Sequence, residues 1–105
     1  MAATVDEIAP DVFRIACYHE PANFQFSSFL VRDDEPLLYH TNLRGFFQDV
    51  AQGVSTLIDA KTIRWIGFSH FESDECGSLN DWLALAPQAE PVCSFVGART
   101  SVGDF

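Results

Sequence analysis

The chain has 105 residues, of which 48% are hydrophobic and 10 are Phe, a composition typical of a globular domain rather than a disordered segment. Its 15 acidic residues outnumber the 6 basic ones and give a formal net charge of -9, which argues against nucleic acid or an anionic membrane surface as a partner. No apolar run is long enough to span a bilayer, and the first residues lack the basic and apolar regions of a signal peptide. We therefore expect one unit over residues 1–105 and a cytoplasmic location.

The first predicted strand lies within residues 7–18, where Phe13, Ile15 and Cys17 alternate with less apolar residues and form one apolar face. The loop that follows contains His19. A single loop histidine is either a metal ligand or a solvated side chain, and the sequence leaves both roles open.

Two further strands are predicted at residues 24–32 and 37–40. The acidic segment Asp33-Asp34-Glu35-Pro36 between them is typical of a tight turn, so the two strands should pair in an antiparallel hairpin. His40 ends the second of these strands. It is expected either to support a nearby functional site or to be a structural histidine.

A helix is expected next, capped by Thr41 or Asn42. Its apolar positions follow the helical repeat and predict a face that packs on the core: Phe47, Val50, Ala51, Val54 and Ile58. The run at 62–68 reads as a buried strand. A helix between two strands makes a crossover connection, so this strand should pair in parallel with the strand at 37–40.

The segment after that strand carries the chemistry. His70, Glu72 and Asp74 occupy alternate positions, and Glu75 follows directly. An extended segment would direct alternate side chains to one side, where an imidazole and two carboxylates could converge on one or two cations. The other interpretation is a solvated acidic face that favours the start of a helix.

A second helix is predicted after the acidic segment. Gly77 frees the backbone, and Ser78 with Asp81 resembles a capping box that opens a helix ended by Pro87. A short strand is expected at 91–95, followed by a helical fragment and coil from Val96 onward.

The three cysteines, Cys17, Cys76 and Cys93, form no C-x-x-C pair. This count argues against a disulfide framework or a thiolate zinc site. Cys17 and Cys93 are expected in the core. Cys76 lies beside the acidic segment and is either inert packing or an oxidation-sensitive thiol.

The stretch from Arg64 to Ser94 resembles the metallo-β-lactamase superfamily, and within it the branch of flavodiiron and oxygen-binding di-iron proteins. The signature of that branch is His-x-Glu-x-Asp-His-Gly/Ser-Gly-Ser-Leu, and the hydrolytic zinc branch has His at the position of Glu72. The resemblance implies that His70 and Glu72 bind one iron and that Asp74 binds the other. Glu75 stands where the family usually has His, so it either ligates iron or points away and leaves a water in its place.

The resemblance also implies a fold. The superfamily has a four-layer αββα sandwich about twice as long as this chain, and its remaining ligands come from later segments. We therefore expect an α/β structure that forms the first half of such a domain, with a mixed sheet, an N-terminal antiparallel hairpin and helices on one face. An uncovered apolar sheet face would favour a homodimer.

The function implied is a non-haem di-iron protein that binds or reduces dioxygen or nitric oxide, with two iron ions as cofactors. In this chain the metal site would be incomplete and the protein inactive alone, so no catalytic residue is assigned. One alternative is a zinc-dependent hydrolase of the same superfamily, which would activate a water molecule. Another is a non-catalytic oxygen sensor or interaction module.

Overall fold

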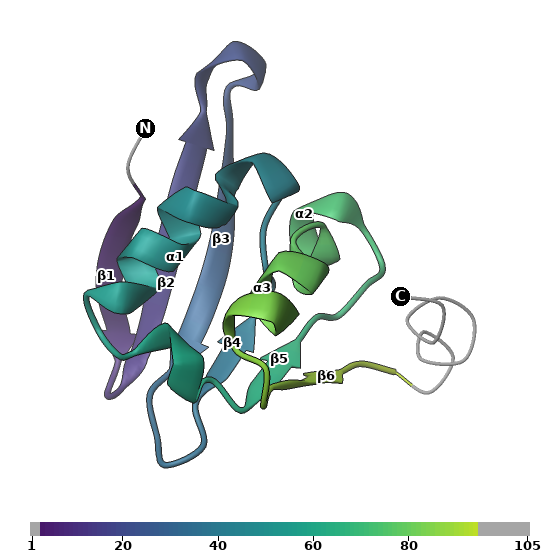
Figure 1. Ribbon diagram of the computed structural model, residues 1–105. Helices are drawn as coiled ribbons and strands as arrows, with labels where there is room; N and C mark the ends of the chain where they lie inside the picture. The colour runs from purple at the N-terminus through teal and green to yellow at the C-terminus, as the bar shows by residue number, and fades with distance from the viewer. Residues whose placement is uncertain (1–2, 95–105) are drawn as a thin grey trace.

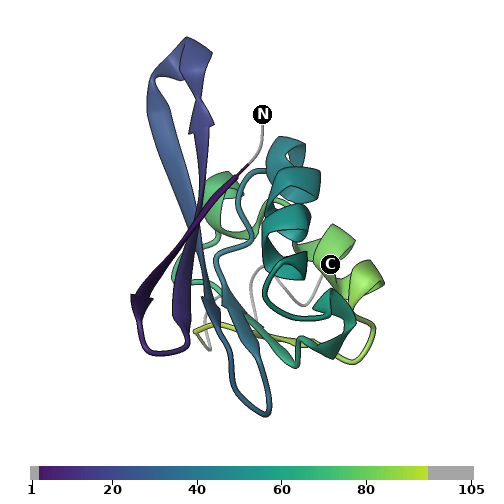
Figure 2. The same cartoon turned by 90° about the vertical axis from the view of Figure 1, so that its left-hand side faces the viewer.

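Six strands form one mixed sheet, and the helices between them lie on one of its faces (Figures 1 and 2). The structure is a computed structural model that describes residues 3–94. The strands are β1 (Thr4–Ala9), β2 (Val12–His19), β3 (Phe24–Val31), β4 (Leu37–Tyr39), β5 (Trp65–Gly67) and β6 (Glu90–Val92). The α-helices are α1 (Phe47–Ser55), α2 (Ser73–Cys76) and α3 (Leu79–Leu85), and 3-10 turns lie at Glu20–Ala22, Arg44–Phe46 and Ala60–Thr62.

The strands follow one another across the sheet in chain order. Strands β1 to β4 pair antiparallel, while β5 pairs in parallel with both β4 and β6. Leu38 is paired with Leu30 on one side and with Ile66 on the other. The predicted hairpin and the predicted parallel crossover are both confirmed. Strands β3 and β4 pair antiparallel across the acidic loop, and α1 with the following 3-10 turn leads to β5, which pairs in parallel with β4.

The N-terminal part differs from the prediction of a single strand within residues 7–18. Two strands are present, β1 and β2, and they turn at Pro10 and Asp11, where Asp11 has a φ of 59°. Strand β1 lies at the edge of the sheet and all but one of its side chains are exposed. The apolar alternation that identified β2 is therefore missing from β1.

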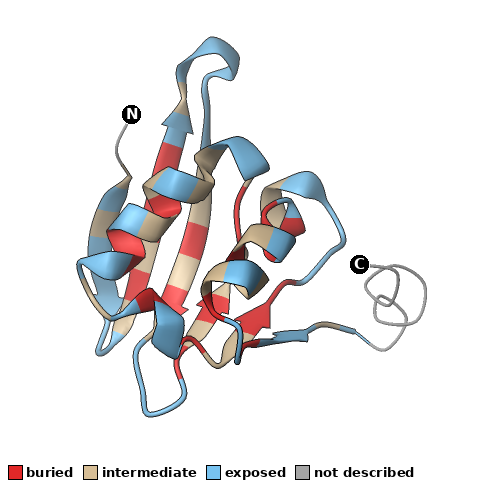
Figure 3. Ribbon diagram, in the orientation of Figure 1, coloured by how far each residue is buried: buried red, intermediate tan, exposed pale blue. Residues whose placement is uncertain are grey.

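The core lies between the sheet and the helices (Figure 3). As predicted, Phe13, Ile15 and Cys17 are buried on one face of β2, and Val50 and Val54 of α1 pack into the same cluster. Each fully buried aliphatic side chain stabilises the fold by roughly 1.5–3 kcal/mol. This burial holds the helices on the sheet and fixes the loops at the ends of β4 and β5.

The opposite face of the sheet is also apolar. Its side chains alternate with the buried ones, and Phe29 pairs with Tyr39 while Val31 pairs with Leu37. These four residues and Trp65 are only partly buried. No element of residues 3–94 covers this face (Figure 2). The described part of the chain therefore has the uncovered apolar sheet face that the sequence predicts.

The predicted start of the first helix needs correction. Helix α1 begins at Phe47 after a 3-10 turn, and its N-cap residue, Phe46, makes no side-chain capping bond. Neither Thr41 nor Asn42 caps it, because both are buried and bonded elsewhere. Helix α3 begins and ends where predicted, at Leu79 and before Pro87.

The last described strand, β6, covers part of the strand predicted at 91–95. The helical fragment predicted from Val96 lies outside the described residues. Within residues 3–94, the helices are all too short or too polar to cross a lipid bilayer.

Candidate metal centre

The acidic segment follows the carboxyl end of β5 and enters helix α2 at Ser73 after a short loop. The backbone carbonyl of Glu72 accepts hydrogen bonds from the amides of Glu75, at 2.9 Å, and Cys76, at 2.8 Å. These bonds begin a helical turn at Ser73. The prediction that the segment stays extended through Asp74 is therefore wrong, and Asp74 reaches the site from the first turn of a helix.

Three carboxylates gather at this turn. One oxygen from each of Glu72, Asp74 and Glu75 lies within 4.8 Å of the others. Glu72 is exposed, whereas the side chain of Glu75 is only 14% exposed. Three like charges this close repel one another unless water or a cation separates them, and this is the one group of its kind within residues 3–94.

His70 lies at the rim of this group rather than inside it. Its side chain is 67% exposed, and its Nδ1 atom lies 3.7 Å from Oε1 of Glu75. The structure thus brings the three predicted carboxylates together and places the His70 imidazole beside them, near Glu75.

The carboxylate of Glu75 is held by the protein. Its Oε2 atom accepts a hydrogen bond from the hydroxyl of Ser69, at 3.1 Å, and another from the backbone amide of His70. Bonds to a charged acceptor are stronger than neutral ones. Glu75 therefore closes the loop that carries His70 and Glu72.

His40 lies next to the carboxylate of Glu75. Its backbone has a φ of 66°, and its ring stacks on Tyr39 with centroids 4.4 Å apart. Its Nε2 atom lies 3.2 Å from Oγ of Ser69 and 3.8 Å from Oε2 of Glu75. Of the two roles left open for His40, the geometry supports a place beside the site.

His19 lies elsewhere, at the end of β2. Its Nδ1 accepts a hydrogen bond from the amide of Ala22, and its ring meets the edge of Phe46. The ring thus caps a 3-10 turn, which supports a structural role over a role as a ligand.

A second set of contacts, which the sequence did not indicate, ties the site to the loop after β4. The backbone amide and the hydroxyl of Thr41 both donate to the carbonyl of Glu75, at 2.6 and 3.1 Å. The hydroxyl of Ser78 donates to the carbonyl of Thr41, at 2.8 Å. Ser78 therefore makes no capping bond to α3, and the predicted capping box is wrong.

Gly77 has a different role from the one predicted. Its backbone is helical, with a φ of -60°, so it needs no special conformational freedom. A Cβ atom at this position would lie 2.3 Å from the carbonyl oxygen of Ser73 and 3.2 Å from the amide nitrogen of Arg44. Glycine is required here because the carbonyl of Ser73 leaves no space for a Cβ atom, and the loop after β4 packs close on the same position.

Cys76 is buried under the acidic turn, where its thiol donates to the carbonyl of Glu72. Burial raises the pKa of this thiol, and the charges of Glu75 and Asp74 raise it further. A protonated, buried thiol reacts slowly. The structure therefore supports inert packing over an oxidation-sensitive role.

The donor set of the cluster fits a hard metal ion. Carboxylate oxygens suit hard cations such as iron or manganese, whereas closed zinc sites are built from thiolates and imidazoles. The separations within the cluster are those that one cation with ligands at about 2.0–2.2 Å could draw together by small side-chain movements. The residues present therefore fit a hard cation, and the negative charge of the chain favours its approach.

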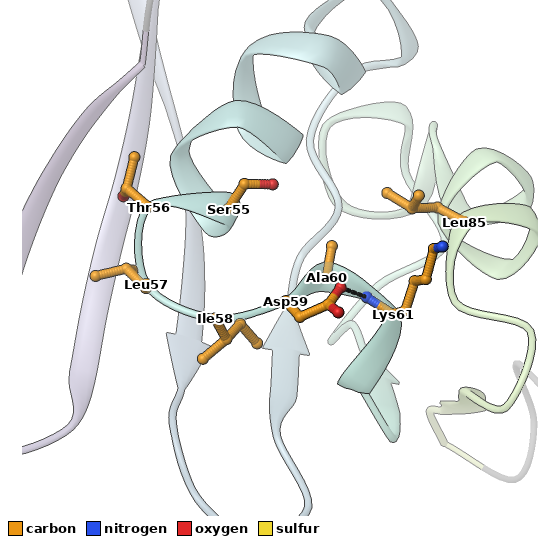
Figure 4. A pocket seen from close by; sticks show the side chains of 8 residues that line it. All are labelled: Ser55, Thr56, Leu57, Ile58, Asp59, Ala60, Lys61 and Leu85. Carbon is orange, nitrogen blue, oxygen red and sulfur yellow. Dashed lines mark hydrogen bonds between the residues drawn. The ribbon is translucent and has the colours of Figure 1, made fainter.

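One hollow among the described residues lies away from this cluster. It has a volume of about 520 Å³ and is formed by residues 55–61 with Leu85, ahead of β5 rather than after it (Figure 4). The side chains of Ser55, Thr56 and Asp59 in its lining make local bonds, such as that from the amide of Lys61 to Asp59. We assign it no function.

Comparisons with known proteins agree with the motif. No family model matches the chain. The diflavin flavoprotein A 2 of a Nostoc species is 31% identical over 104 aligned positions, which cover 89% of this chain and 18% of that protein. The anaerobic nitric oxide reductase flavorubredoxin of Pectobacterium carotovorum is 29% identical over 69 residues, covering 66% of this chain and 14% of the relative. The chain thus spans less than a fifth of either relative.

Solved structures show the same fold. The rubredoxin oxygen:oxidoreductase of Desulfovibrio gigas superposes with a TM-score of 0.83 at 17% identity, covering 97% of this chain and 28% of that one. A metallo-β-lactamase of Cronobacter sakazakii gives 0.78 at 20% identity, covering 91% and 36%. The predicted resemblance is confirmed: in sequence the chain is similar to part of these flavoproteins, and in fold it is similar to solved flavodiiron and metallo-β-lactamase structures.

Proposed function

We propose that the chain supplies part of a non-haem di-iron site that binds or reduces dioxygen or nitric oxide. One observation carries this proposal: three carboxylates converge at the carboxyl end of β5, with His70 at their rim. The names of the relatives support it, because they include a nitric oxide reductase and an oxygen:oxidoreductase.

Each residue has a proposed role. His70 and Glu72 would hold one iron and Asp74 the other, while Glu75 would offer the oxygen that its bonds to Ser69 and His70 leave free, Oε1. Iron would supply the electron-transfer chemistry, and carboxylate ligands would favour its oxidised state. Residues 3–94 hold a single cluster of three carboxylates, so the remaining ligands would come from elsewhere in a complete αββα domain.

The donor set weighs against zinc hydrolysis. A hydrolytic zinc site would be expected to have His at the position of Glu72, and the cluster offers three carboxylates instead. An oxygen sensor would use the same iron ligands as a reductase. Turnover with an electron donor separates those two, because a sensor binds the gas without consuming electrons.

The preference for iron over zinc can be tested with Glu72→His, which installs the residue of the hydrolytic branch. The chain would be dialysed without oxygen against equimolar Fe(II) and Zn(II), and the bound metals measured. We expect the ratio of bound iron to bound zinc to fall at least about tenfold in the variant, because imidazole suits zinc better than carboxylate does. Glu90→Gln, on the exposed strand β6, is the control. An unchanged ratio in Glu72→His would contradict the proposed role of Glu72.

The uncovered sheet face motivates a second proposal, that two copies of the chain associate through it. Phe29, Val31 and Leu37 lie on this face, and exposed apolar surface of this kind favours association. Light scattering on the purified chain would show a dimer, and Val31→Lys would return it to a monomer. A monomeric wild-type chain would contradict self-association.

A further inference from the structure

The two oxygens of Glu75 have different surroundings. Oε2 accepts bonds from the hydroxyl of Ser69 and the amide of His70. Oε1 has the ring of His70 nearby, with Nδ1 at 3.7 Å. Oε2 is therefore used in hydrogen bonds to the loop, while Oε1 faces His70 and remains available to bind a cation.

The hydroxyl of Ser69 fixes the direction of the next bond. A hydroxyl has a single proton, and here that proton is donated to Oε2 of Glu75. The contact between Oγ of Ser69 and Nε2 of His40, at 3.2 Å, can then form only if His40 donates. A neutral His40 must therefore carry its proton on Nε2.

The backbone holds His40 in place for this bond. Its amide donates to the carbonyl of Gly67, at 2.8 Å, and its ring stacks on Tyr39. The side chain is 20% exposed. A left-handed backbone conformation costs free energy in residues other than glycine, and in His40 it coincides with a ring directed at the site.

We propose that Ser69 and His40 are positioning residues that orient the carboxylate of Glu75 through a directed chain of hydrogen bonds, from Nε2–H of His40 to Ser69 and from Ser69 to Oε2. This inference rests on the proposed function where it concerns metal, and on geometry alone where it concerns the tautomer of His40. These hydrogen bonds occupy Oε2, so Oε1 is the oxygen that Glu75 presents to a cation.

The first test needs no metal. Two-bond proton–nitrogen correlation spectra, recorded near pH 8 where an ordinary histidine is neutral, show which ring nitrogen of His40 is protonated. We expect the Nε2–H form alone in the wild-type chain and in Ser69→Thr, and a mixture of the two neutral forms in Ser69→Ala. The Nδ1–H form in the wild-type chain would overturn the proposed direction of the hydrogen bonds.

The second test measures the affinity for Mn(II), an air-stable hard cation. Removing a group that orients a ligand typically weakens metal binding about 10–100-fold, so Ser69→Ala should fall in that range and Ser69→Thr should restore binding. Ser55→Ala, which removes an exposed hydroxyl bonded to the carbonyl of Ala51, should leave the affinity unchanged. Wild-type affinity in Ser69→Ala would overturn the positioning role.

The two proposals can fail separately. If the wild-type chain binds no Mn(II) but shows the Nε2–H form, the metal function fails while the hydrogen-bond chain stands. If it binds Mn(II) and shows the Nδ1–H form, the metal function stands and the positioning chain is wrong.

Discussion

The Ser78 hydroxyl donates a hydrogen bond to the backbone carbonyl of Thr41, 2.8 Å away, and both residues are fully buried. Thr41 in turn donates twice to the carbonyl of Glu75. The loop after β4 and the acidic turn are therefore one hydrogen-bonded unit. This unit sets the backbone positions from which the three carboxylates project.

Two buried serines should respond in opposite directions to replacement by alanine. Ser78→Ala leaves the carbonyl of Thr41 without its hydroxyl donor and should lower the free energy of unfolding by about 1–3 kcal/mol. The hydroxyl of Ser28 is equally buried but has no partner among the described residues. Ser28→Ala should therefore raise the free energy of unfolding by about 1 kcal/mol. Urea denaturation measures both, and a destabilised Ser28→Ala would show that its hydroxyl is bonded after all.

Two glycines offer a similar comparison. A Cβ at Gly77 would lie 2.3 Å from the carbonyl oxygen of Ser73, whereas a Cβ at Gly45 would meet nothing within 4 Å. Gly77→Ala should lower the free energy of unfolding by at least about 2 kcal/mol because the backbone must move. Gly45→Ala should be neutral or should stabilise the chain by about 0.4–1 kcal/mol, because it restricts the unfolded state. Equal effects in thermal unfolding would contradict the close packing at Gly77.

The three thiols should differ in reactivity. Burial raises the pKa of Cys17 to about 11, with a further contribution from the charge of Asp49, and the pKa of Cys76 is also raised. Because the thiolate is the nucleophile, iodoacetamide near pH 8 should modify Cys93 first and the other two slowly. Peptide mass spectrometry identifies the modified thiol, and all three should react in urea. Rapid modification of Cys17 in the folded chain would contradict its burial.

The same shift gives a pH dependence with a definite sign. Because the pKa of Cys17 is higher in the folded chain than in the unfolded one, its contribution to stability is fully present below the unfolded pKa of 9.0. That contribution is lost as the pH rises toward about 11. Cys17→Ala should remove this part of the alkaline destabilisation.

The sequence predicted the parts of the fold that depend on local patterns. The alternation at Phe13, Ile15 and Cys17 identified β2, and the acidic turn at 33–36 identified the hairpin of β3 and β4. Strand β1 gave no such signal because an edge strand exposes nearly all its side chains.

The site was only partly predictable for a different reason. The motif indicated the three carboxylates, but α2 has four residues, too few to show a helical period, so its start at Ser73 was missed. Thr41 and Ser78 lie 37 positions apart. Only the folded chain brings them together. No local pattern could indicate that Thr41 and Ser78 bond to each other instead of capping a helix.

The central claim is that the acidic turn binds a hard cation, and equilibrium dialysis of the purified chain against Fe(II) without oxygen tests it most directly. Asp74→Asn removes one carboxylate of the cluster, and His70→Ala removes the imidazole at its rim. The control His19→Ala removes an imidazole at the end of β2, which is not part of the cluster. We expect at least one iron per chain in the wild type and in His19→Ala, and at least about tenfold weaker binding in the two site variants. Iron bound equally by all four proteins, or by none of them, would contradict the claim.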